Sequence, residues 1–280
     1  MKLLKQFFNF YINSSIHVAL SVFSLSWISL IEFNIPYDAS VLYFIFFSSI
    51  TGYNFVKYFG IAKFHHRSLA TSLKAIQLFS FFSFIILCYY TFQLNTISLF
   101  YIIGFGLITF FYAIPFLPKH LFVDSRQNLR SISGLKVYLI ALVWCGVTVF
   151  LPLINNHYAI NSDVMITGIQ RFIFIIVLML PFEIRDLQYD SLKLATIPQK
   201  IGVWQTKMMG MLLLICFFLL EFLKNNKTEN YLIVLFVMTV LTMLFLMISK
   251  KEQGKYFSSF FVEGLPILWL IMLLLFNYFS

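Results

Sequence analysis

Nine long apolar stretches constrain this chain more than any other feature of its sequence. They occupy residues 15–33, 39–59, 73–92, 96–118, 135–154, 164–184, 208–223, 231–249 and 258–279. Most approach the roughly 20 residues that an α-helix needs to cross a bilayer core. Hydrophobic residues fill 60% of the 280 positions and charged residues only 11%, an excess that no water-soluble core of this size could bury. We therefore expect an integral, multi-pass membrane protein.

The apolar stretches are continuous and lack the alternation of barrel strands that face lipid. This predicts an all-α bundle of about nine transmembrane helices, formed by residues 1–280 as a single transmembrane domain. Residues 1–13 set apolar and aromatic side chains against Lys2 and Lys5 and are predicted to be an amphipathic lead-in to the first span.

The distribution of basic residues predicts the orientation. With a cytoplasmic N-terminus, 17 of the 20 Lys and Arg residues fall on the cytoplasmic side, and only Arg171, Lys224 and Lys227 do not. By the positive-inside rule, the C-terminus then lies outside, and we assign the chain to a bacterial inner membrane. The net charge of +9 sits in short loops between spans, which favours membrane lipids over nucleic acid as the partner. The oligomeric state is not legible in the sequence.

Three longer polar connections are predicted on the cytoplasmic side, at residues 57–74, 119–134 and 182–207, where they could meet as one cap. The third is the most unusual, because it places several carboxylates directly after an apolar span.

These acids are Glu183, Asp186 and Asp190, separated by three and then four residues. On a continuing helix they share one face, about one turn apart, so their oxygens can converge. A Mg²⁺ ion that shares its shell with phosphate oxygens would neutralise them. The alternative is a solvated acidic helix end paired with nearby basic residues. Those residues are Arg185, Lys193 and Lys200.

Segment 186–202 resembles the second aspartate-rich motif of the UbiA superfamily of intramembrane prenyltransferases, which reads Asp-x-x-x-Asp, then Thr-Leu-Pro, then Leu-Gly. The matching positions are Asp186, Asp190, Thr196, Pro198 and Gly202. Segment 111–119 is similar to the Tyr-x-x-Pro-Pro of the family, and Lys136 and Trp144 stand where a Lys and a Trp are often found. The resemblance implies a UbiA-like bundle of nine helices.

The resemblance also implies an activity and its ligands. A UbiA-like enzyme moves a prenyl group from a polyprenyl diphosphate to an aromatic or other lipophilic acceptor, so an isoprenoid lipid is the expected substrate. Glu183, Asp186 and Asp190 would hold Mg²⁺, with one ion at most expected.

The first aspartate-rich motif of the family, Asn-Asp-x-x-Asp-x-x-x-Asp, is not preserved. Aligning Asn54 with its Asn puts Phe55, Tyr58 and Ala62 where the three acids belong. This departure predicts weakened or lost activity. A catalytically inactive isoprenoid-binding protein is therefore the alternative, and a transporter is a more distant one.

Basic side chains could grip the diphosphate in place of the missing acids, with Asn54 orienting it. The candidates are Lys57, Lys63, Arg67, Lys119, Lys136 and Lys193. The alternative is that these cations only set the topology. Glu263 and Arg171 lie inside apolar stretches, where an ionisable residue is either functional or held by an inward hydrogen bond.

Overall fold

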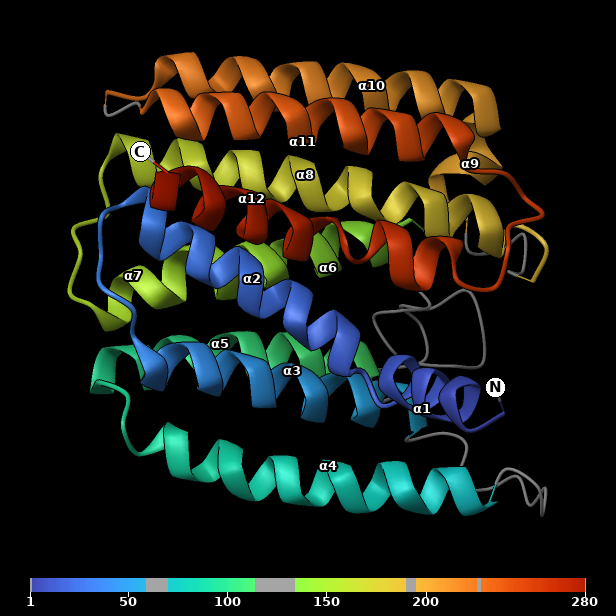
Figure 1. The fold of residues 1–280 in the computed structure, drawn as a ribbon, viewed down its shortest axis with the longest axis horizontal. Helices are drawn as coiled ribbons and strands as arrows, with labels where there is room; N and C mark the ends of the chain where they lie inside the picture. The colour runs from blue at the N-terminus through green and yellow to red at the C-terminus, as the bar shows by residue number, and fades with distance from the viewer. Residues whose placement is uncertain (1, 59–69, 114–133, 190–194, 226–227, 280) are drawn as a thin grey trace, which may run out of the picture.

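The computed structural model describes residues 2–58, 70–113, 134–189, 195–225 and 228–279, and within them every regular element is a helix. The long helices lie side by side along one axis of the molecule (Figure 1). Helix α1 (Lys2–Asn13) lies at the end that carries the N-terminus, which we call the α1 end; the C-terminus lies toward the opposite end. The all-α prediction is confirmed for this part of the chain.

The first half of the chain forms α2 (Ile16–Glu32), α3 (Ala39–Tyr58), α4 (Ala70–Thr91), α5 (Thr96–Ala113), α6 (Lys136–Cys145), η4 (Gly146–Phe150) and α7 (Leu151–Asn155). The second half forms α8 (Ser162–Asp186), α9 (Ile197–Ile201), α10 (Val203–Leu219), η6 (Leu220–Leu223), α11 (Glu229–Ile248), η7 (Phe257–Val262) and α12 (Leu265–Phe279).

Among the described residues, seven helical units are long and apolar enough to cross a membrane, and α1 with α2 makes a further unit that is bent by 56°. Helix α5 adds a shorter apolar segment, Thr96–Phe111. Over the described residues, each of the nine predicted apolar stretches overlaps one of these helical units. The prediction of a multi-pass membrane protein is confirmed.

The seventh span begins earlier than its sequence suggests. The prediction starts this span at residue 208 and counts Lys207 among the cytoplasmic basic residues before it. In the structure the span is Val203–Leu223, and the Lys207 Nζ donates a hydrogen bond of 2.7 Å to the backbone oxygen of Met247 in α11. The carbonyl that accepts from this half-buried lysine lies 40 residues away in the chain.

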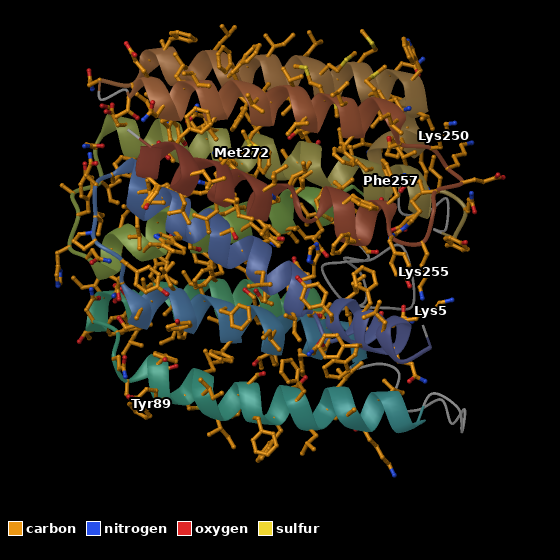
Figure 2. The ribbon with its side chains drawn as sticks, in the orientation of Figure 1. Lys5, Tyr89, Lys250, Lys255, Phe257 and Met272 are labelled. Carbon is orange, nitrogen blue, oxygen red and sulfur yellow. The ribbon has the colours of Figure 1, made fainter. Side chains whose placement is uncertain are left out.

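Helix α8 forms the centre of the bundle, with 67% of its membrane window buried, against 11% for α4 at the edge. Its Phe174 packs against Phe217 of α10 and Trp269 of α12, with ring centroids 5.6 and 5.3 Å away, and these two rings lie 6.0 Å from each other. Most of α4 faces outward, as Tyr89 does in Figure 2. Lipid tails solvate such side chains, so their exposure is not costly there.

A buried charged cluster closes the end opposite α1. The Lys224 Nζ lies 2.5 Å from Glu32 Oε1 at the end of α2 and 2.7 Å from Glu221 Oε2 in η6. The Tyr231 hydroxyl of α11 donates to the other Glu32 oxygen at 2.9 Å. The guanidinium of Arg171 in α8 lies 5.3 Å from the ring centre of Trp269. The first three contacts tie α2, η6 and α11 together, and the fourth joins α8 to α12.

We expect Lys224→Met to lower the free energy of unfolding by about 3 kcal/mol, because two buried carboxylates would lose their shared cation. Thermal unfolding of the detergent-solubilised protein measures this. Lys250→Met, which removes an exposed ammonium, is the control. Equal unfolding temperatures for the two variants would show that the buried pairs do not stabilise the bundle.

Candidate active site

Two of the predicted acids come together at the last turn of α8. Glu183 is buried, and the Lys136 Nζ in the first turn of α6 lies 3.1 Å from its Oε1 and 3.7 Å from Asp186 Oδ2. One ammonium therefore reaches both carboxylates. The sequence proposes Lys136 as a diphosphate ligand, whereas the geometry makes it the counter-charge of the acids.

Asp186 has a second basic partner. The Arg185 Nη2 lies 2.8 Å from Asp186 Oδ1, and its Nε donates to the same oxygen at 2.9 Å. The guanidinium also lies 5.3 Å from the ring centre of Phe182. The sequence names Arg185 as a possible partner of the acids, and the structure pairs it with Asp186. Helix α8 ends at Asp186, and Asp190 lies outside the described residues.

Asn54 of α3 is buried in a separate hydrogen-bonded group at the α1 end. Its amide donates to the Ser14 backbone oxygen at 2.9 Å and to Ser80 Oγ of α4 at 2.8 Å. Its Oδ1 accepts from Ser15 Oγ at 2.8 Å, and Ser15 Oγ in turn accepts from Lys57 Nζ at 2.9 Å. Asn54 and Lys57, both predicted diphosphate ligands, are thereby joined through one serine.

These bonds fix the corner between α1 and α2. Ser15 sits at that corner with φ at 63°, in the left-handed region that a serine adopts only at a cost. Before the corner, on α1, Phe8 packs against Tyr256 and Phe260, and Phe10 packs against Phe79 of α4. The predicted amphipathic lead-in is therefore the helix α1, which contacts both α4 and the last span.

A hydrogen bond joins the helices that carry the two groups. The Trp144 Nε1 of α6 donates to the Tyr53 hydroxyl of α3 at 2.7 Å. Tyr53 precedes Asn54 on α3, and Trp144 stands two helical turns beyond Lys136 on α6. Trp144 matches the family pattern, but the sequence gives no sign of its partner.

The segment that connects α8 to α10 ends at a glycine whose backbone conformation other residues rarely adopt. Gly202 has φ at 85°, and a Cβ there would lie 2.8 Å from Gln205 Oε1. A Cβ on Gly134, whose φ is 72°, would lie 3.5 Å from the Ala195 backbone oxygen. Gly134, the last residue of the predicted cap loop 119–134, therefore lies beside Ala195 of the predicted loop 182–207.

The other predicted site residues are not placed. Lys63, Arg67, Lys119, Asp190 and Lys193 lie outside the described residues. At the position of the first missing acid, Phe55 is exposed on α3. The sequence does not predict that Ser14 and Ser15 bond to Asn54 or that Tyr53 bonds to Trp144, because the partners lie far apart in the chain.

The fit to a divalent cation is partial. The described residues contain no group of three His, Cys, Asp or Glu side chains that could hold a metal ion. Glu183 and Asp186 converge, and Mg²⁺ often uses one or two carboxylates together with substrate phosphates. Lys136 occupies the place between them, so an ion would have to displace this ammonium.

Lys136→Met leaves the buried Glu183 carboxylate without its ammonium, and we expect it to destabilise the protein by about 3 kcal/mol. Adding Glu183→Gln removes the stranded charge, so the double variant should recover most of the loss. Thermal unfolding of both proteins in detergent measures this coupling. Additive losses would contradict the pairing.

The overall fold is similar to that of a solved digeranylgeranylglyceryl phosphate synthase. The two are 16% identical and superpose with a TM-score of 0.57, over 99% of this chain and 97% of that chain. No family model and no curated protein matches the chain. At this low identity the similarity establishes the fold, and it confirms the UbiA-like bundle expected from the sequence motifs.

Proposed function

We propose that this chain, with its UbiA-like fold, is a membrane prenyltransferase that moves a prenyl group from a polyprenyl diphosphate to an aromatic or other lipophilic acceptor. The observation that carries the proposal is the group formed by Lys136, Glu183 and Asp186 at the end of the central helix. Paired acids and a cation at this place suit a ligand that brings phosphate oxygens to a membrane interface.

The chain's cations bind the leaving group. The Lys136 and Lys57 ammonium groups donate charge-assisted hydrogen bonds to phosphate oxygens, and Asn54 keeps Ser15 in place to hold Lys57. The basic residues of the cap loops add to this clamp. They are Lys63, Arg67, Lys119 and Lys193.

The transfer balances without an oxidant or reductant. The bond between the prenyl C1 and the diphosphate oxygen breaks, and its electron pair leaves with the diphosphate. C1 then bonds to the acceptor, which gives up a proton. Mg²⁺ held by Glu183, Asp186 and Asp190 would neutralise charge on the leaving group.

Two observations favour the second candidate, an isoprenoid-binding protein without transfer activity. The exposed Phe55 replaces the first acid of the missing motif, and Lys136 and Arg185 already neutralise the acids that remain. Such a site could bind a prenyl diphosphate and leave its C–O bond intact.

Incubation with radiolabelled geranylgeranyl diphosphate and a panel of lipophilic phenols, with Mg²⁺ or with a chelator, distinguishes the two. We expect a prenylated product, and we expect Asp186→Asn to slow its formation about a hundredfold through loss of charge stabilisation. Glu252→Gln, an exposed acid on the α11 to η7 connection, should leave the rate unchanged. Retained binding of the donor without any product would favour the binding protein.

The α1 end is proposed to face the cytoplasm. Lys5, Lys250 and Lys255 gather there (Figure 2), as expected of the positive side of a multi-pass protein. An alkaline phosphatase fused after Ser280 should therefore be active in a bacterial host. If a green fluorescent protein fused at the same position fluoresces instead, the C-terminus lies in the cytoplasm and the proposed orientation is wrong.

A further inference from the structure

Asn9 joins α1 to the connection between α11 and η7. Its side-chain oxygen accepts two hydrogen bonds, one from the Lys255 Nζ at 2.9 Å and one from the Tyr256 hydroxyl at 2.8 Å. An ammonium can only donate, so the atom of Asn9 that faces Lys255 is the oxygen and not the nitrogen. The Asn9 amide nitrogen, which carries two N–H donors, has no acceptor among the residues that the structure describes.

Aromatic packing holds these donors in place. Phe8, next to Asn9 on α1, packs against the rings of Tyr256 and Phe260, with ring centroids 5.0 Å apart in each pair. The Lys255 ammonium lies 5.3 Å from the centre of the Tyr256 ring. The hydrogen bonds of Asn9 and the packing of Phe8 therefore fix α1 against the segment that carries Lys255.

Lys5 adds a second ammonium to this group. It stands four residues before Asn9, one turn away on the same face of α1, and Figure 2 shows both Lys5 and Lys255 at the α1 end. Both lysines are exposed, and among the described residues neither forms an ion pair with a carboxylate. Glu252, three residues before Lys255, is exposed and pairs with neither. Positive charge and amide donors thus gather where the described residues supply no anion.

Two apolar side chains stand beside these donors on α1. Leu4 is 78% exposed and Phe7 is 73% exposed, and the two lie about one helical turn apart. Helix α1 also departs by 56° from the direction of α2, so it does not continue the line of the first span. At a bilayer surface, such side chains enter the acyl chains while neighbouring ammonium groups reach the phosphates.

We propose that Lys5, Asn9 and Lys255 form a binding site for the phosphate of an anionic phospholipid headgroup. The phosphate oxygens accept from the two ammonium groups and from the Asn9 amide, and Leu4 and Phe7 contact the acyl chains around it. The site offers donors and positive charge, which favours an anionic headgroup over a zwitterionic one that carries its own ammonium. It uses none of the residues of the proposed transfer reaction, so the two proposals can fail separately.

The experiment is native mass spectrometry of the full-length protein, released from detergent micelles that contain equal amounts of dioleoyl phosphatidylglycerol and dioleoyl phosphatidylcholine. We expect the wild type to retain phosphatidylglycerol preferentially. Lys5→Gln and Lys255→Gln should each weaken its binding about fivefold, the effect of one lysine near an anionic membrane surface. Lys74→Gln removes an exposed charge from the start of α4 at the α1 end and should leave the binding unchanged.

A matched substitution separates ligand binding by Asn9 from its structural role. Asn9→Asp has nearly the same shape and keeps an oxygen for Lys255 and Tyr256, so α1 should stay attached. It replaces the amide donor with a negative charge, which should repel the phosphate and weaken phosphatidylglycerol binding about tenfold or more. Thermal unfolding in detergent checks that this variant is folded.

Equal retention of the two lipids by the wild type would overturn the proposed site, and so would wild-type affinity in a folded Asn9→Asp variant. An equal loss of binding in Lys74→Gln and Lys255→Gln would also overturn it, because diffuse attraction to a basic surface would then explain the preference. Displacement of the lipid by inorganic pyrophosphate at the same concentration would assign these donors to a free phosphate ligand instead of a headgroup.

Discussion

The ion pair between Lys136 and Glu183 is the contact around which the α1 end is organised. It joins the first turn of α6 to the last turns of α8 and allows a carboxylate to stay buried beside an apolar core. An unpaired charge there would be too costly to keep, so the acid and the ammonium fix each other's position. Asp186, Arg185 and the nearby loop ends are arranged around this pair.

The charged side chains at the two ends of the bundle differ in how exposed they are. At the opposite end, Lys224, Glu32 and Glu221 are buried and satisfy one another. At the α1 end the side chains of Lys136, Asp186 and Arg185 are 17%, 23% and 31% exposed. A polar ligand therefore meets accessible charge at the α1 end, whereas the buried pairs close the other.

The helices could be predicted because the physics of the bilayer is simple. A backbone in hydrocarbon must satisfy its own hydrogen bonds, so the length of an apolar stretch is enough to locate a span. The grouping of Glu183 and Asp186 followed from helical spacing alone. Lys207 shows the limit of such reasoning, since its partner lies on another helix.

The contacts of Asn54 and of Trp144 could not be predicted. The first depends on a left-handed serine at the corner between α1 and α2, and the second on the approach of α6 to α3. Both join residues many positions apart, and no local pattern encodes such pairs. The sequence could mark Glu263 as unusual, but its backbone oxygen accepts from Ser21 of α2, which lies 242 positions away in the chain.

The six residues of η7 form a π-helical turn, and this turn affects the position of the residues that follow it. A π-helical turn holds about one residue more than an α-helical turn, so it sets the rotation of everything that follows. Removing one residue there would turn α12 by about 100°, carrying Trp269 away from Phe174 and Phe217. Such a chain would keep its hydropathy profile and lose the interlocked rings at its centre.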